Sequence, residues 1–265
     1  MTDATAPAET PAKKAKKPAP KATLKSELRF YGIFFACALT FWTFGFGHYR
    51  IPSESMQPTL EVGDRLYVSK FSYGYSRQDL PFGDNFKFLG DGILFEKLPE
   101  RGDVAVFRDP KSRKVLIKRL VGLPGDKIEY REGRLIINDN IVERTKVDEF
   151  LYREHKKRGD ENSPRVVKVT KYEESWPGED GSHFIYEQAD GYSNDRRGPF
   201  IVPAGHTFFI GDNRDNSTDS RAPNGPGFVP VHMLIGRAER MVLSFKRCKK
   251  EEGLHCPGKR WFQKL

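Results

Sequence analysis

Ser53 and Ser55 lie between Pro52 and Pro58 in the segment IPSESMQPTL, residues 51–60. Because proline fixes its own φ and restricts the residue before it, we expect an extended or turning segment here and not a helix. Such a segment presents serine hydroxyls on a stiff backbone, from which one could attack a carbonyl. A serine pair in a loop more often serves only in hydrogen bonding, so nucleophilic catalysis requires a nearby base.

Histidine is the base that usually activates serine, but none of the six histidines lies in a recognisable catalytic-triad motif. They are His48, His155, His183, His206, His232 and His255. The motifs HExxH and GxxxxGK[ST] are also missing from the sequence, which excludes zinc-protease and P-loop chemistry. A buried lysine is the remaining candidate, because burial disfavours the charged amine and lowers its pKa from about 10.4 toward neutrality.

Lys118 interrupts an apolar run in the segment KVLIKRLVGLPGD, residues 114–126. The run is typical of a strand that ends at a Pro-Gly turn. By strand alternation Leu116, Lys118 and Leu120 point to one face and Arg119 points to the other. Apolar neighbours on its own face would keep the amine out of water. A lone lysine in a strand is otherwise a solvated edge residue, so the pattern by itself leaves both interpretations open.

The chain after residue 50 consists of short β-branched and aromatic runs that are separated by Gly, Pro, Asp and Asn. Regular alternation of strands with helical patterns is missing, so a doubly wound parallel sheet is disfavoured. We therefore predict a mainly β, antiparallel domain over residues 48–265. Residues 139–200 are crowded with charged side chains and hold few apolar pieces, which indicates an insertion or smaller subdomain.

The N-terminal part has two predicted regions. Residues 1–29 carry seven basic and three acidic residues and few large apolar ones, so we expect a disordered basic tail. Residues 30–47, FYGIFFACALTFWTFGFG, hold no charge, and as a helix they would cover about 27 Å of a bilayer core of about 30 Å. This predicts a single transmembrane anchor with the tail in the cytoplasm and the β domain exported. A buried core helix and a cleaved export signal are the alternatives.

Composition limits the remaining classes. The chain has 265 residues, of which 37% are hydrophobic and 31% charged, and this excludes a transporter with many spans. The net charge of +9 permits anionic partners but does not choose between lipid and nucleic acid. Three cysteines are too few for a disulfide scaffold and lack zinc spacing. Cys248 and Cys256 are either a disulfide pair in an oxidising compartment or two unrelated thiols.

Five motifs together resemble the bacterial type I signal peptidases, also called leader peptidases. In order they are IPSESMQPTL, GDRLYVSKFSYG, RGDVAVF, LIKRLVGLPGD and GDNRDNSTDSR, within residues 51–74, 101–129 and 205–221. The resemblance implies a serine endopeptidase with a Ser/Lys dyad on a signal-peptidase-like antiparallel β fold. It further implies an inserted smaller subdomain and a position at the outer face of the bacterial cytoplasmic membrane.

The resemblance also implies roles for individual residues. Ser55 matches the nucleophile and Lys118 the general base, while the Ser53 hydroxyl and the Ser55 N–H match the oxyanion donors. Ser217 matches the hydroxyl that orients the lysine. The supporting motif, with its Asp/Arg ion pair, corresponds to Gly211, Asp212, Asn213, Asp219 and Arg221. The candidates for shallow substrate pockets are Ile51, Met56 and Ile117. Two departures from the family pattern, Glu54 between the serines and Leu116 beside the base, leave substrate preference open.

The expected partners are preproteins that bear signal peptides, lipids of the cytoplasmic membrane and the secretion translocon, with no nucleic acid. No cofactor and no metal are expected. A calcium loop in the GDNRDNSTDS stretch is excluded, because Arg214 stands where such a loop needs an acidic or amide residue and Ser217 stands where it needs a glycine. A self-cleaving Ser/Lys repressor would need a DNA-binding helix-turn-helix module, which residues 1–29 cannot form. A membrane-tethered, non-catalytic β domain that binds exported proteins is the other alternative.

Overall fold

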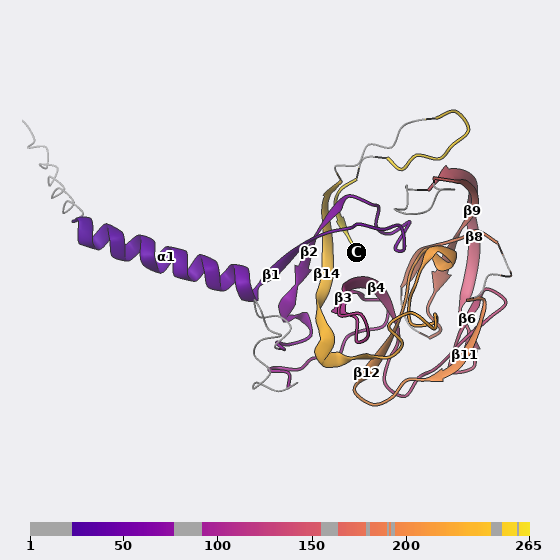
Figure 1. Ribbon diagram of the computed structural model, residues 1–265, viewed down its shortest axis with the longest axis horizontal. Helices are drawn as coiled ribbons and strands as arrows, with labels where there is room; N and C mark the ends of the chain where they lie inside the picture. The colour runs from indigo at the N-terminus through magenta and orange to yellow at the C-terminus, as the bar shows by residue number, and fades with distance from the viewer. Residues whose placement is uncertain are drawn as a thin grey trace, which may run out of the picture. The chain divides into compact units, whose positions relative to one another are not determined.

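The computed structural model describes residues 23–76, 92–154, 164–178, 181–189, 191, 194–244, 251–258 and 260–265. Its regular structure is mainly antiparallel β, as the sequence predicts (Figure 1). The chain divides into two compact units, Met1–Leu39 and Thr40–Leu265. In the described ranges, every strand and all the predicted site residues belong to the second unit.

The N-terminal helix α1 covers Leu24–Phe44. It begins six residues before the apolar run, because Leu, Lys, Glu and Arg all favour helix and the Thr23 carbonyl accepts the backbone N–H of Ser26 (2.8 Å). It also ends earlier than predicted, since Phe46 and Gly47 already belong to strand β1. In the part of the chain that the structure describes, no helix is long and apolar enough to cross a membrane, and the predicted anchor stays unconfirmed.

The largest sheet has eight strands, with the order β1-β2-β14-β3-β4-β12-β13 and with β15 beside β14. Figure 1 shows β2, β14 and β3 in this arrangement. The strands are β1 Phe46–Arg50, β2 Asp64–Ser69, β3 Val104–Arg108, β4 Val115–Gly122, β12 His206–Ile210, β13 Val229–Pro230, β14 Leu234–Ser244 and β15 Trp261–Lys264. Strand β4 lies between β3 and β12, and Lys118 pairs with Ala105 of β3 just before the part of β4 that pairs with β12.

Two smaller sheets complete the described fold. One has the order β10-β9-β8, and the other has the order β11-β5-β6-β7. Their strands are β5 Lys127–Arg131, β6 Arg134–Ile137, β7 Asn140–Ile141, β8 Glu143–Arg153, β9 Val166–Ser175, β10 Ser182–Glu187 and β11 Arg196–Ile201. The region predicted as an insertion, residues 139–200, thus supplies a three-stranded sheet of its own. The strands at the two ends of this region, β7 and β11, pair with β6 and β5, which precede the region in sequence.

Among the residues that the structure describes, three short 3₁₀ helices occur between the strands. They are η1 Lys70–Ser72, η5 Arg214–Asn216 and η6 Val231–Met233. Of these, η5 lies between Asn213 and Ser217, within the GDNRDNS motif.

The described residues include two of the three cysteines, Cys37 and Cys256. Cys37 is a free thiol on α1, and Cys256 is disulfide-bonded. Cys248, which the sequence leaves as either a partner of Cys256 or an unrelated thiol, lies outside the described residues.

Candidate active site

The segment that carries Ser53 and Ser55 is a closed loop before β2, without helix or strand. The Ile51 N–H donates to the Asp64 carbonyl (2.9 Å), and the Gly63 N–H donates back to the Ile51 carbonyl (2.8 Å). Between these ends the Gln57 N–H donates to the Glu54 carbonyl (3.0 Å) in a tight turn. These bonds fix both ends and the middle of the loop, so the serine positions are set by backbone geometry.

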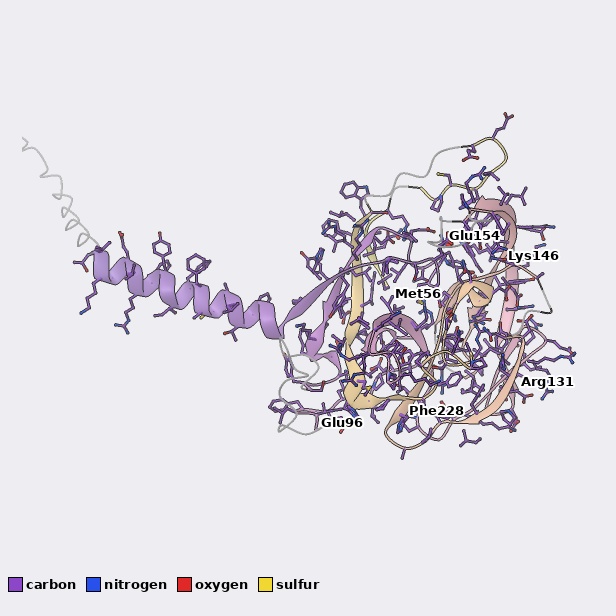
Figure 2. The ribbon with its side chains drawn as sticks, viewed as in Figure 1. Met56, Glu96, Arg131, Lys146, Glu154 and Phe228 are labelled. Carbon is purple, nitrogen blue, oxygen red and sulfur yellow. The ribbon has the colours of Figure 1, made fainter. Side chains whose placement is uncertain are left out.

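Apolar side chains anchor this loop in the core. Ile51 and Met56 are 2% and 0% exposed and pack in a cluster with Leu66 and Val106. Figure 2 labels Met56, which lies inside the β domain. Both side chains are therefore buried in this cluster, and their role at shallow substrate pockets stays a prediction. Ile117 is half-buried at the edge of the same cluster.

Lys118 is brought to Ser55 from the middle of β4. Its side chain is buried, and its Nζ donates a hydrogen bond to Ser55 Oγ. On the neighbouring strand β3 the residue opposite Lys118 is the small Ala105. Ala105 shares a hydrophobic cluster with Leu116 and Leu120, which agrees with the alternation predicted for β4. The lysine amine therefore reaches the serine hydroxyl along an apolar face.

Burial also changes the proton affinity of this amine. The loss of hydration lowers the pKa of Lys118 to about 8, against the opposing effect of the Asp219 and Asp212 carboxylates, which favour the charged form. The nearby Arg221 charge lowers the pKa further. A pKa near neutrality allows the amine to act as a base at ordinary pH.

Ser53 lies on the open side of the site. Its side chain is exposed, and its Oγ lies 3.4 Å from Ser55 Oγ. From this position the Ser53 hydroxyl can donate a hydrogen bond to the oxygen of a carbonyl group that Ser55 attacks. The backbone N–H of Ser55 is a second candidate donor, as the family resemblance implies.

The predicted Asp/Arg ion pair is formed by Asp219 and Arg221. Arg221 Nε and Nη2 bind the two carboxylate oxygens at 3.0 and 2.9 Å, and both side chains are fully buried. The Gly211 N–H donates to the same carboxylate (3.0 Å). Burial would raise the pKa of Asp219, but the Arg221 charge and these hydrogen bonds hold it below its usual value. The bond from Gly211 to Asp219 thus ties the beginning of residues 211–221 to their end.

Asp212 has a different arginine as its partner, which sequence reasoning missed. Arg119 Nε and Nη2 bind its two oxygens at 2.8 and 2.7 Å, and the Thr59 hydroxyl donates to the second oxygen at 2.5 Å. Alternation predicts that Arg119 points away from the face of Lys118, and on that side it meets Asp212. The signal was available, because an arginine inside a buried strand needs an opposite charge.

Asn213 holds the nucleophile loop against the loop that follows β12. Its backbone N–H donates to the Ser55 carbonyl (3.2 Å), and its Nδ2 donates to the Glu54 carbonyl (3.2 Å). The Glu54 carboxylate is buried and accepts a hydrogen bond from Asn216 Nδ2 (3.2 Å). Glu54, which departs from the family pattern, is therefore part of the contact between these two loops.

Gly211 and Ser217 meet at this contact. A Cβ on Gly211 would lie 2.2 Å from Ser217 Oγ and 2.5 Å from the Ser55 carbonyl oxygen, so only glycine allows this approach. The Ser217 hydroxyl is buried but has no hydrogen-bond partner among the described residues. The structure thus places Ser217 beside the site without the predicted bond to Lys118. No group of three or more potential metal ligands occurs in the same described ranges.

Comparisons with known proteins match most of the chain. A family model described as signal peptidase, peptidase S26, matches residues 24–243. The signal peptidase I of Rickettsia typhi is 38% identical over 231 residues, which are 84% of this chain and 82% of that protein. The signal peptidase I of Rickettsia felis is 40% identical over 205 residues, 75% of this chain and 71% of that protein. A crystal structure of a signal peptidase I from Enterococcus faecalis is 25% identical and covers 53% of this chain and 97% of that one, with a TM-score of 0.30, too low for a comparison of folds.

Proposed function

Because the chain belongs to the signal peptidase family, peptidase S26, we propose that Ser55 is its nucleophile and Lys118 its general base. The protein is a serine endopeptidase that removes signal peptides from preproteins. The observation that supports the assignment to these two residues is the buried hydrogen bond between Lys118 Nζ and Ser55 Oγ. Membership of a peptidase family disfavours the alternative of a non-catalytic binding domain.

The proposed first step is the attack of Ser55 on the scissile carbonyl. When Lys118 is neutral, its lone pair accepts the hydroxyl proton along the existing Nζ–Oγ contact, and Oγ bonds to the carbonyl carbon. The carbonyl oxygen becomes an oxyanion, to which the Ser53 hydroxyl and the Ser55 N–H donate hydrogen bonds. The intermediate then collapses to an ester on Ser55, and the leaving amine takes the proton from Lys118.

Hydrolysis of the ester repeats the same roles. Lys118, neutral again, takes a proton from a water molecule, and the resulting hydroxide attacks the ester carbonyl. The bond to Ser55 Oγ then breaks, the cleaved signal peptide leaves with a carboxyl end, and Oγ takes the proton from Lys118. With a pKa of about 8, about one Lys118 in ten is neutral at pH 7. A lysine in water has a pKa of about 10.4 and would be neutral far less often, so burial supplies most of the available base.

The substrate class and the place of action belong to the same proposal. Signal peptides end in small residues of the Ala-x-Ala type, and the scissile bond follows them. Residues 30–47 anchor the chain in the cytoplasmic membrane, with residues 1–29 in the cytoplasm and residues 48–265 outside, where membrane lipids and the secretion translocon are its neighbours. Support comes from the uncharged run and from exposed apolar side chains on α1, among them Phe34, Phe35 and Leu39. Alkaline extraction of membranes, together with protease accessibility of each end, tests this topology.

The test of the dyad is cleavage of a purified preprotein by the full chain in detergent. Ser55→Ala and Lys118→Ala should each abolish cleavage, and Lys118→Arg should fail as well because guanidinium stays protonated. Lys114→Ala is the matched control, since Lys114 is exposed just before the same strand. A folded Lys118→Ala protein that cleaves at the native rate would contradict the assignment.

A further inference from the structure

Glu174 and Arg214 form an ion pair between the three-stranded inserted sheet and the active-site loop. Arg214 Nη1 donates to Glu174 Oε1 at 2.8 Å, and Arg214 Nη2 donates to Glu174 Oε2. Each side chain is 1% exposed. Glu174 belongs to β9, whereas Arg214 begins η5 in the GDNRDNS motif, so the pair joins two segments that lie 40 positions apart.

Glu174 has a fixed position in the inserted sheet. It lies on the central strand, opposite His183 of β10 and Arg144 of β8. The His183 ring stacks on Trp176, with 4.7 Å between ring centroids, and its Nε2 lies 3.5 Å from Glu174 Oε2. Burial and the charges of Arg119 and Arg214 lower the pKa of His183 well below its usual value, so this ring is neutral. Arg214 therefore supplies the charge that balances the Glu174 carboxylate.

From Arg214 the contacts continue to the base. Its carbonyl accepts a hydrogen bond from Arg221 Nη2 (2.8 Å), and Arg221 binds Asp219. Asp219 is the carboxylate with the largest charge effect on Lys118. Contacts that begin on β9 thus reach the immediate surroundings of the proposed general base.

A second contact holds the other end of the same loop. The Tyr186 N–H of β10 donates to the Asp212 carbonyl (2.9 Å), and Tyr186 forms a short parallel bridge with Asn213. The Asn213 N–H in turn donates to the Ser55 carbonyl. The inserted sheet therefore contacts residues 211–221 near both the nucleophile and the base.

We infer that Glu174 is a positioning residue of the reaction, which holds residues 211–221 in the productive geometry through its buried ion pair with Arg214. This inference rests on the proposed roles of Ser55 and Lys118. Without the carboxylate, the Arg214 guanidinium would be an uncompensated charge in the interior. It would move toward water and displace the backbone that carries Asp212, Asn213 and Ser217. A displacement of about 1 Å in a catalytic site can reduce the rate by about 100-fold.

The first experiment compares Glu174→Gln with Glu173→Gln in preprotein cleavage by the full chain in detergent. Glu173 is the adjacent residue on β9, is half-buried, and accepts a hydrogen bond from the Ser182 hydroxyl. We expect Glu174→Gln to lower kcat by about 10-fold to 100-fold with KM changed less than about 3-fold. Glu173→Gln should leave both constants within about 2-fold of the native values. A folded Glu174→Gln protein with native kcat, or an equal loss in both variants, would overturn the inference.

A double variant separates positioning from stability alone. Glu174→Gln combined with Arg214→Met removes both buried charges, and replacement of a buried ion pair by apolar groups often restores stability. We expect the double variant to recover Tm relative to Glu174→Gln while kcat stays about 10-fold or more below native. Recovery of kcat together with Tm would show a merely structural role. If Lys118→Ala also proved active, the proposed dyad itself would fail, whereas inactive Lys118→Ala beside fully active Glu174→Gln would reject only this inference.

Discussion

Lys118 Nζ donates a hydrogen bond to Ser55 Oγ although the two residues are 63 positions apart. Ser55 belongs to a loop that precedes the second strand of the large sheet, and Lys118 belongs to a strand inside that sheet. The apolar side chains that bury the lysine are sheet neighbours, and the loop is held by its own backbone bonds and by Asn213. The amine can therefore lose its proton while it remains in contact with the hydroxyl that it must activate.

The rate of cleavage should depend on the protonation of Lys118. Only the neutral amine can accept the Ser55 proton, and burial lowers the pKa of Lys118 to about 8. We therefore expect kcat to rise about tenfold per pH unit below pH 8 and to become constant above it. A kcat profile measured on preprotein between pH 6 and 10 tests this. A midpoint near 6.5, the ordinary pKa of imidazole, would indicate a histidine base instead.

Loss of the Ser53 hydroxyl should slow the chemical step. Ser53→Ala removes a donor whose Oγ lies 3.4 Å from Ser55 Oγ, on the open side of the site. Removal of one oxyanion donor typically lowers kcat by about 100-fold to 1,000-fold. Single-turnover cleavage of preprotein would measure this step directly. Ser53→Thr keeps a hydroxyl and should retain more activity than Ser53→Ala. Equal rates for the native and alanine proteins would remove Ser53 from the oxyanion site.

Gly211→Ala should damage catalysis more than binding. The added Cβ would lie 2.5 Å from the Ser55 carbonyl oxygen and 2.2 Å from Ser217 Oγ, so the nucleophile loop must shift. We expect kcat to fall by about 100-fold while KM changes little. Gly92→Ala is the control, because a Cβ there has nothing within 4 Å. Steady-state kinetics of both variants measure kcat and KM. A native kcat in Gly211→Ala would contradict this prediction, because the loop would then tolerate the added Cβ.

Asp212→Asn should destabilise the domain by leaving Arg119 without its carboxylate. Arg119 binds both oxygens of Asp212, and the two side chains are 9% and 1% exposed. Breaking a buried pair of this kind costs about 3–5 kcal/mol of the free energy of unfolding. Denaturant unfolding followed by fluorescence measures the change. In Asp139→Asn, which breaks the exposed pair with Lys127, the loss should be less than about 1 kcal/mol. Similar losses in both variants would mean that the Arg119 pair has no special stabilising role.

Much of the local structure could be predicted because it depends on short-range patterns. Alternation along residues 114–122 placed Leu116 and Leu120 on the face of Lys118, and the structure has this arrangement. Prolines at 52 and 58 excluded a helix around the serines. The start of α1 was predicted less well, because an apolar run does not show where a helix of good formers such as Leu24 and Lys25 begins.

Residue types and motif order, both properties of the sequence alone, determined the mainly β fold, the family and the residues that could react. The tertiary structure decided which partners these residues have: Arg119 pairs with Asp212, Arg214 pairs with Glu174, and Met56 packs against Leu66 in a buried cluster. The reason is physical. Alternation and turn preference act between neighbours in the chain, whereas a buried charge is neutralised by whichever opposite charge the folded chain brings within hydrogen-bond distance.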